Sequence, residues 1–268
     1  MKRPSLCALG LWLWLGAAAA PPALAGPLPF EDLLPRAQAE LSHVRYHLTT
    51  SWGFGPRENH YNELIEEAVK VSWSDAQSPL PPLLYKSLMA VESAFKPDAV
   101  SSAGAAGLAQ LMPDTAKRFG LSHRERLDPY KALPVGIAAL EEKHRVICDP
   151  GNYYAVVGMS PKPCPWGDKV AAAYSRFGMP EGEDRWYLVL GAYNGGGGTI
   201  LRAMARTYDK GLDPRKWDNV AGPPGHCLHT PLHEACCEVF GSRSSESKTR
   251  ELANYPRKIF AYFHRSGT

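Results

Sequence analysis

The sequence predicts a mainly α-helical protein. Apolar residues recur at spacings of three and four through most of the chain, the period that gives a helix one apolar face. The strict apolar and polar alternation that is typical of half-buried strands is scarce. Segments rich in Gly, Pro and Ser, such as 49–58 and 74–82, separate the helical stretches and indicate connections between them.

The helices follow from this periodicity, with boundaries defined to within a few residues. We expect them near 31–48, 59–72, 80–94, 113–119, 133–146, 168–176, 184–206 and 248–264. Two irregular stretches lie between them. Residues 147–167 have the turn chemistry of a long surface loop, and residues 207–230 form a second irregular stretch.

Residues 1–25, MKRPSLCALGLWLWLGAAAAPPALA, have the features of a secretory signal peptide. Lys2 and Arg3 precede an apolar run that closes in a small-x-small cleavage site at residues 23–25. An uncleaved membrane anchor is the alternative, but the apolar core is shorter than the roughly 20 residues that a spanning helix needs. We therefore expect export to the periplasm or cell envelope.

Charge and length limit the remaining possibilities. The formal charge of +3 falls to +1 once Lys2 and Arg3 are removed, so nothing favours nucleic acid as a partner. The remaining length fits either one large domain or one domain with a helical extension. We expect a helical N-terminal extension over 26–77 and a single domain over 78–268.

Five cysteines follow the signal segment, and an oxidising compartment makes disulfides their default use. Cys148 and Cys164 would close a local loop. Cys227 would pair with either Cys236 or Cys237, and one thiol is left over. A zinc site is the alternative for the last three cysteines together with His229 and His233, but an exported protein oxidises such thiols and tandem short-spaced cysteine pairs are lacking.

Glu92 lies near the end of an apolar helix in the segment SPLPPLLYKSLMAVESAFKP. Pro81 and Pro82 can start this helix and Pro97 ends it. Its apolar face is formed by Leu84, Leu88, Val91 and Phe95. A carboxyl partly withdrawn from water has a raised pKa and can give and take a proton near neutral pH. The alternative is an ordinary surface or capping glutamate.

The following segment, DAVSSAGAAGLAQLMPDTA, predicts a loop that returns to the end of this helix. Gly104 and Gly107 permit a tight turn before Pro113 starts another helix. The residues brought back over the helix end are Ser101, Gln110 and Met112.

Three motifs in this order resemble the soluble lytic transglycosylases, which are related in fold to goose-type lysozyme. ESAFKPDAVSSAGAAGLAQLMPDTA resembles the family signature, LVLGAYNGGGGTI a second family segment, and ELANYPRKI the C-terminal helix of the family. The resemblance covers roughly residues 80–268. It implies a lysozyme-like catalytic domain, mainly α-helical, preceded by the N-terminal extension.

The resemblance implies that Glu92 is the catalytic acid/base and that no cofactor or metal is needed. The residues that match positions lining the family's sugar cleft are Ser101, Gln110, Met112, Tyr193, Asn194 and Tyr255. Four of them have a simpler alternative: Ser101 as a turn cap, Met112 as core filler, and the two tyrosines as packed aromatic residues.

The activity implied by the resemblance is cleavage of the β-1,4 bond between N-acetylmuramic acid and N-acetylglucosamine in peptidoglycan, leaving a 1,6-anhydromuramic end. A hydrolase on the same fold, lysozyme-like or chitinase-like, is one alternative. A catalytically dead glycan-binding or assembly protein is another, although the retained Glu92 argues against it. The sequence leaves open whether the enzyme cleaves chain ends or interiors, whether it serves an envelope-spanning machinery, and its oligomeric state.

Overall fold

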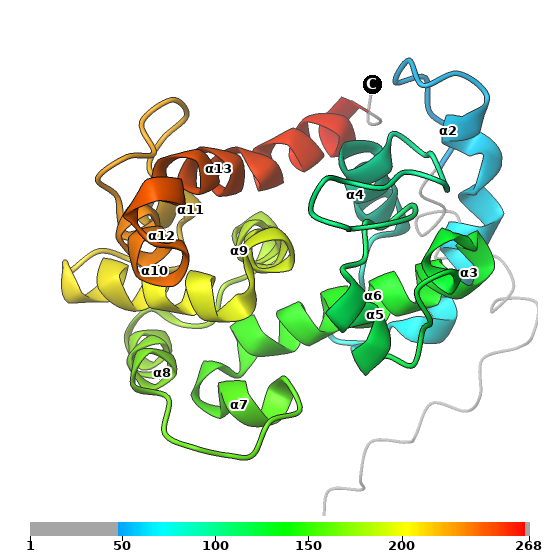
Figure 1. Cartoon of the computed structure of the whole chain (residues 1–268). Helices are drawn as coiled ribbons and strands as arrows, with labels where there is room; N and C mark the ends of the chain where they lie inside the picture. Colours follow the sequence, from blue (N-terminus) through cyan, green and yellow to red (C-terminus); the bar gives the residue numbers. More distant parts are fainter. Residues whose placement is uncertain (1–47, 266–268) are drawn as a thin grey trace, which may run out of the picture. The chain divides into compact units, whose positions relative to one another are not determined.

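The computed structural model describes residues 48–265, and they fold into helices joined by short connections (Figure 1). The α-helices are α2 (Arg57–His60), α3 (Asn62–Ser72), α4 (Pro82–Ser93), α5 (Pro113–Arg118), α6 (Pro129–Cys148), α7 (Tyr153–Val156), α8 (Pro165–Phe177), α9 (Gly182–Gly195), α10 (Gly197–Asp209), α11 (Trp217–Ala221), α12 (Pro231–Phe240) and α13 (Ser242–Arg265). Within residues 48–265 there is no β-strand, only isolated antiparallel bridges in the loop that follows α4. The mainly helical prediction is confirmed.

Two N-terminal predictions cannot be compared with the structure. The signal segment 1–25 lies outside the described residues, and so does the helix expected near 31–48, except for Leu48, which is not helical. The later part of the predicted extension is described and consists of α2 and α3. Helix α3 packs on α4 and α6, so this part of the chain joins the same core.

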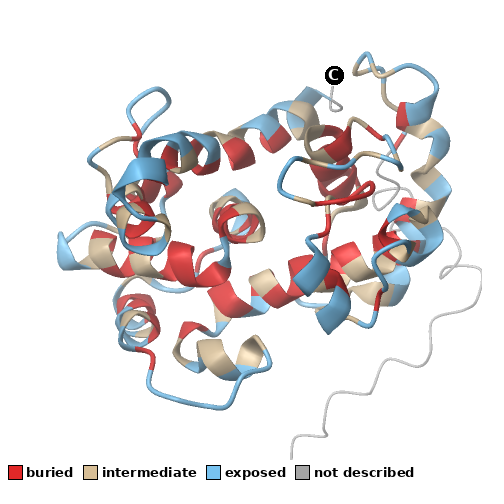
Figure 2. Ribbon diagram, in the orientation of Figure 1, coloured by how far each residue is buried: buried red, intermediate tan, exposed pale blue. Residues whose placement is uncertain are grey.

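Helix α9 is the central helix of the fold. Leu188, Val189 and Leu190 are all fully buried, which is the pattern of a helix that is apolar on every side. Figure 2 shows buried residues on α9, which contacts α6, α10 and α13. Gly191 allows the close approach of Trp217, because a Cβ atom there would lie 2.6 Å from the indole ring. Helix α13 in turn packs on α4, the helix that carries Glu92.

The single helix predicted over 184–206 is two helices. Gly196 has a φ of +84° and separates α9 from α10. Gly195 also lies directly against the Leu252 side chain. The run of glycines at 195–198 therefore breaks the helix, because glycine adopts left-handed backbone angles at little cost.

Several short elements outside the predicted helices are helical. Helix α12 was not predicted, although Thr230 and Pro231 form an ordinary helix start: the Thr230 side chain accepts a hydrogen bond from the His233 backbone N–H at 3.2 Å. Helix α11 lies within 207–230. The 147–167 segment contains α7 and a 3₁₀ turn, Pro150–Asn152, before α8 begins at Pro165.

The predicted disulfides are absent, because all five cysteines described are free thiols. Cys148 lies on the last turn of α6, where its Sγ is 3.6 Å from His144 Nε2 rather than bonded to Cys164. Burial raises the pKa of the Cys148, Cys164 and Cys236 thiols, so they stay protonated. Among residues 48–265 no group of His, Cys, Asp and Glu side chains is arranged to hold a metal ion.

None of the helices between residues 48 and 265 combines the length and the apolar character needed to cross a bilayer.

Candidate active site

Glu92 lies on the last turn of α4, where the helix ends abruptly. Pro82 occupies the first turn, as predicted, and the helix ends at Ser93, within one residue of the predicted range 80–94. Ala94 and Phe95 both have positive φ, +50° and +61°, which is uncommon for residues other than glycine. The buried Phe95 ring compensates for this strained turn, which sends the chain away from α4 and leaves Glu92 at the helix end.

The carboxyl of Glu92 is held by a tyrosine from the C-terminal helix. The Tyr255 hydroxyl, on α13, donates a hydrogen bond to Glu92 Oε1. Tyr255 is 5% exposed and lies beneath the carboxyl rather than on an open surface. The contact joins two helices that are 163 residues apart in sequence at this point.

Burial raises the pKa of Glu92 to about 7. The Tyr255 hydrogen bond and the Lys248 ammonium act in the opposite direction, and the Glu251 carboxylate raises the pKa further. Burial is the largest effect. The hydration free energy that a carboxylate loses on leaving water exceeds the stabilisation that a single neutral hydrogen bond provides. Glu92 therefore holds or releases a proton near neutral pH.

A cavity of about 340 Å³ lies next to Glu92. Its lining residues come from α4, the loop 98–112, α9 and α13: Glu92, Ser101, Ser102, Ala103, Ala105, Gln110, Met112, Tyr193, Asn194, Lys248 and Glu251. The structure thus brings together every residue predicted for the site except Tyr255, which reaches the cavity only through its hydrogen bond to Glu92. We take this cavity as the candidate active site.

Ser101 and Gln110 make hydrogen bonds within the loop 98–112, so only part of each side chain is left for a ligand. Ser101 Oγ accepts a hydrogen bond from the Ala105 backbone N–H at 3.0 Å, so its turn-capping role is confirmed and its own hydrogen is left for another acceptor. Gln110 Nε2 donates to the carbonyls of Ala99 and Gly107 at 3.1 and 3.0 Å. The amide oxygen of Gln110 is the group left for a ligand in the cavity.

Met112 and Tyr193 differ in how they line the cavity. Met112 is 43% exposed immediately before α5, so it is not core filler. Tyr193 is partly buried on α9, and its hydroxyl donates to the Ala109 carbonyl at 2.9 Å. That bond ties the loop wall to the central helix, so Tyr193 supports the cavity as well as lining it.

Arg126 positions the loop wall, and sequence reasoning missed it. Its side chain is 1% exposed, and Nη1 donates to the carbonyls of Gly104 and Leu111 at 2.7 Å each. The two acceptors lie on the two limbs of the loop 98–112, so one guanidinium holds them together. No sequence motif marked Arg126, which lies in a 3₁₀ turn between α5 and α6.

Lys248 and Glu251 form a charged pair on the cavity wall, and they too were missed. Lys248 Nζ donates to Glu251 Oε1 at 2.8 Å and to Asn194 Oδ1 at 3.3 Å. Glu251 precedes Tyr255 by four residues and therefore shares its face of α13. The motif ELANYPRKI contained this signal, because it starts at Glu251 and includes Tyr255.

The arrangement suits acid/base chemistry on a neutral, oxygen-rich ligand. It offers one carboxyl with a raised pKa, backbone-fixed polar groups, and a second carboxylate that an adjacent ammonium neutralises. A pair of titratable groups with different environments is a common way to divide acid and ionised roles within one site.

Comparisons with known proteins identify the family of the matched region. The transglycosylase SLT domain matches residues 72–215, which is more than half of the chain. The match includes Glu92, the loop 98–112 and Tyr193, and it ends before α13. It confirms the resemblance carried by the sequence motifs and, with the helical architecture, the predicted fold class.

Curated relatives include proteins named membrane-bound lytic murein transglycosylase F. The protein of that name from Ectopseudomonas mendocina is 30% identical over 132 residues, which is 48% of this chain and 20% of the relative. Its counterpart from Alcanivorax borkumensis is 27% identical over 160 residues, 60% of this chain and 26% of the relative. The aligned part therefore spans about a fifth to a quarter of the length of these relatives.

Proposed function

The chain belongs to the transglycosylase SLT domain family, and on that basis we propose that it is a lytic transglycosylase acting on peptidoglycan. The observation that carries the proposal is the Glu92 carboxyl, whose pKa of about 7 suits a group that both donates and accepts a proton. The names of the curated relatives support the same substrate class.

In the first step Glu92 acts as general acid. It transfers its proton to the oxygen that bridges N-acetylmuramic acid and N-acetylglucosamine, and the bond from that oxygen to the muramic anomeric carbon breaks. Since Oε1 accepts the Tyr255 hydrogen bond, the transferred proton is on Oε2. The substrate's own acetamido group stabilises the positive charge that develops at the anomeric carbon.

In the second step the same carboxylate acts as general base. It accepts the proton of the muramic C6 hydroxyl while that oxygen attacks the anomeric carbon, which forms the 1,6-anhydro ring and returns Glu92 to its acid form. No water is consumed. An intramolecular nucleophile needs no separately positioned water, which is why one carboxyl is enough.

The remaining cavity residues bind and orient the sugar. The Gln110 amide oxygen, the Ser101 hydroxyl and the Asn194 amide face a common space, and Met112 offers an exposed apolar surface. Tyr255 positions Glu92. We propose that the protein meets its substrate after export, by means of the segment 1–25, in the periplasm or cell envelope.

A hydrolase is the second candidate, and Glu251 is the observation that favours it. This carboxylate lines the same cavity as Glu92 and could orient a water, as in glycosidases that use two carboxyl groups. Its ion pair with Lys248 at 2.8 Å argues against that role, because the Lys248 ammonium already donates to the Glu251 oxygen that would hold the water.

Product analysis separates the two candidates. Purified peptidoglycan is digested with the wild-type protein, and the muramic ends are identified by mass spectrometry. We expect 1,6-anhydromuramic ends, which are lighter by one water than the reducing ends left by hydrolysis. Glu92→Gln should lose nearly all turnover and stay folded. Reducing ends alone, or substantial turnover by Glu92→Gln, would contradict the proposal.

A further inference from the structure

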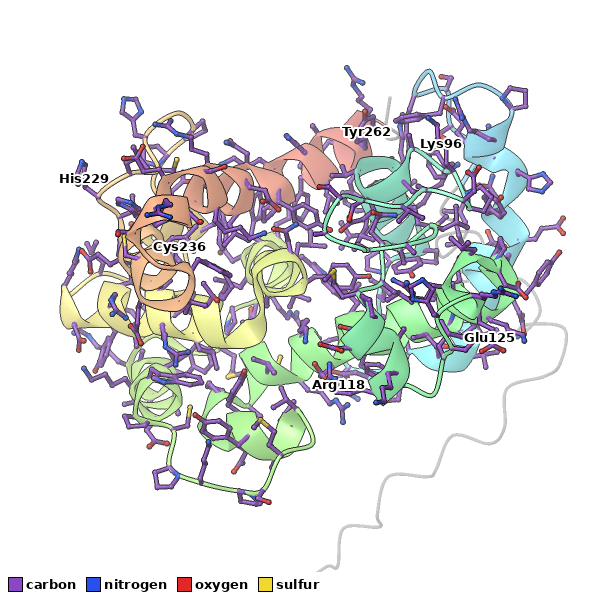
Figure 3. The ribbon with its side chains drawn as sticks, in the orientation of Figure 1. Lys96, Arg118, Glu125, His229, Cys236 and Tyr262 are labelled. Atoms are coloured by element: carbon purple, nitrogen blue, oxygen red, sulfur yellow. The ribbon has the colours of Figure 1, made fainter. Side chains whose placement is uncertain are left out.

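A second cavity lies along α13 beyond the contact between Glu92 and Tyr255. It has a volume of about 440 Å³ and is lined by Phe54, Ala90, Val91, Lys258, Ala261, Tyr262 and Arg265. Figure 3 labels Tyr262 near the end of α13.

The two cavities follow one another along the same pair of helices. On α4, Val91 lines the second cavity and Glu92 lines the first. On α13, spacings of four, three and four residues place Glu251, Tyr255, Lys258 and Tyr262 on one face. Glu251 belongs to the first cavity and Lys258 to the second, with Tyr255 between them. The second cavity therefore lies one to two turns further along α13 than the first.

The outer wall of the second cavity is a loop held by a buried carboxylate. Glu58 is 3% exposed and accepts hydrogen bonds from the backbone N–H groups of Trp52 and Phe54, each at 2.9 Å. Phe54 then packs with ring centroids 5.3 Å from Phe95 and 5.6 Å from Tyr262. The wall is therefore built and fixed before any ligand arrives.

The chemistry of the second cavity combines aromatic surface with a positive charge. The Phe54 and Tyr262 rings are partly exposed, and such faces pack well against the C–H surface of a pyranose ring. Lys258 is exposed and has no hydrogen-bond or ion-pair partner within residues 48–265. A ligand that offers both a sugar ring and a carboxylate would satisfy both groups.

We propose that this cavity binds the stretch of peptidoglycan strand next to the cleaved bond, with a sugar ring on Phe54 and Tyr262 and a muramyl carboxylate on Lys258. The inference rests on the proposed function. Glu251 and Lys258 are about 10 Å apart along the helix axis, a span that suits a neighbouring disaccharide. Phe54 and Lys258 lie outside the matched residues 72–215, so the family match gives them no role.

Calorimetric titration of the full chain tests the proposal, with Glu92→Gln as the background so that probes are not cleaved. The probes are a neutral N-acetylglucosamine oligosaccharide, a muramyl-containing fragment without stem peptides, and the same fragment with its stem peptides. Adding Lys258→Gln should raise the Kd of one or both muramyl fragments about fivefold and leave the Kd of the neutral probe within twofold. The fragment that responds identifies whether the lactyl or the peptide carboxylate is bound.

Phe54→Ala, in the same background, should raise the Kd of all three probes about tenfold, since it removes part of the sugar platform. Lys258→Glu checks the charge at an exposed position where folding is not at risk, and it should weaken the anionic fragments more than Lys258→Gln. Lys70→Gln, an exposed lysine on α3, is the matched control and should change no Kd.

The proposal is overturned if Lys258→Gln and Lys258→Glu behave like Lys70→Gln, or if they weaken the neutral probe as much as the charged ones. The proposed function fails by a different result, namely the absence of any cleavage by the wild-type chain. Because these titrations measure binding by an inactive variant, the two failures are distinguishable.

Discussion

Glu92 keeps its proton near neutral pH because several opposing effects leave burial dominant. Its pKa rises to about 7, although Tyr255 donates a hydrogen bond to the ionised form and Lys248 favours the negative charge. The Tyr255 hydroxyl also has a second role. By occupying Oε1 it decides which carboxyl oxygen carries the proton that the cavity receives.

Tyr255→Phe should lower kcat about tenfold and change KM by less than twofold. The variant keeps the ring packing but loses the bond that orients the carboxyl, and a tenfold fall corresponds to about 1.4 kcal/mol in the barrier. It should also move the alkaline limb of the kcat/KM profile to higher pH, because the Tyr255 bond lowers the pKa of Glu92. A rise in KM with unchanged kcat would make Tyr255 a sugar-binding residue instead.

Removing Glu251 and removing Lys248, the charged pair on α13, should shift the pKa of Glu92 in opposite directions. Glu251→Gln removes a negative charge that disfavours ionisation, so the pKa of Glu92 falls and the alkaline limb moves to lower pH. Lys248→Met removes a positive charge, so the limb moves to higher pH. Steady-state kinetics across pH 5 to 9 measure both shifts. Shifts of the same sign would contradict this electrostatic role.

The site residues that the sequence identified were those with a motif around them. Glu92, Gln110 and Tyr193 carried such a signal, and the structure places all three at one cavity. Lys248 did not, because its role arises only when α13 folds back beside α9 to bring it near Asn194. A contact between residues 54 positions apart has no local signature.

At the scale of elements, the loop 98–112 is the part of the site that most needs support. It contains no regular structure beyond isolated bridges, and Gly104 and Gly107 adopt positive φ within it. Three contacts compensate: the Gln110 amide, the Tyr193 hydroxyl and the Arg126 guanidinium. The last is buried and reaches both limbs of the loop.

Arg126→Met should destabilise the fold by about 2 kcal/mol, because the Gly104 carbonyl loses its side-chain donor. The buried Leu111 carbonyl keeps only the Ala106 backbone N–H. Arg124→Met, two residues away and exposed, is the matched control and should be close to neutral. Urea denaturation measures both changes. Equal effects of the two substitutions would show that the guanidinium does not hold the loop.

The helix predictions were wrong where a glycine or a helix-capping pair, rather than the spacing of apolar residues, sets the end of a helix. Most helices from α3 to α13 lie close to their expected ranges, because apolar spacing follows the face that each helix buries. A single helix was predicted over 184–206 because the apolar period continues across Gly196. The positive φ of Gly196 instead ends one helix and starts the next. Helix α12 was missed because its cysteines and histidines suggested a disulfide or metal segment rather than a capped helix.

For the whole molecule, a half-buried carboxyl with a raised pKa affects stability as well as catalysis. Glu92 has a pKa of about 7 in the folded state against 4.5 for an ordinary glutamate. Between these values the folded chain binds more protons than the unfolded chain, so stability falls as pH rises from about 4.5 through 7.

Glu92→Gln removes this dependence. The Tm of the variant minus the Tm of the wild type should therefore be a few degrees larger at pH 8 than at pH 5. Scanning calorimetry at both pH values measures the difference. Glu63→Gln, an exposed position on α3, is the control and should give the same difference at both. A constant difference for Glu92→Gln would mean that Glu92 ionises normally.

The most direct measurement is the titration of the Glu92 carboxyl itself. Carbon NMR of protein labelled at the glutamate carboxyl, with Glu92→Gln to assign the missing resonance, follows ionisation from pH 3 to 9. The structure predicts a midpoint about 7 for this one resonance. A midpoint close to 4.5, the ordinary value for glutamate, would contradict the claim that the fold holds Glu92 ready to protonate a glycosidic oxygen.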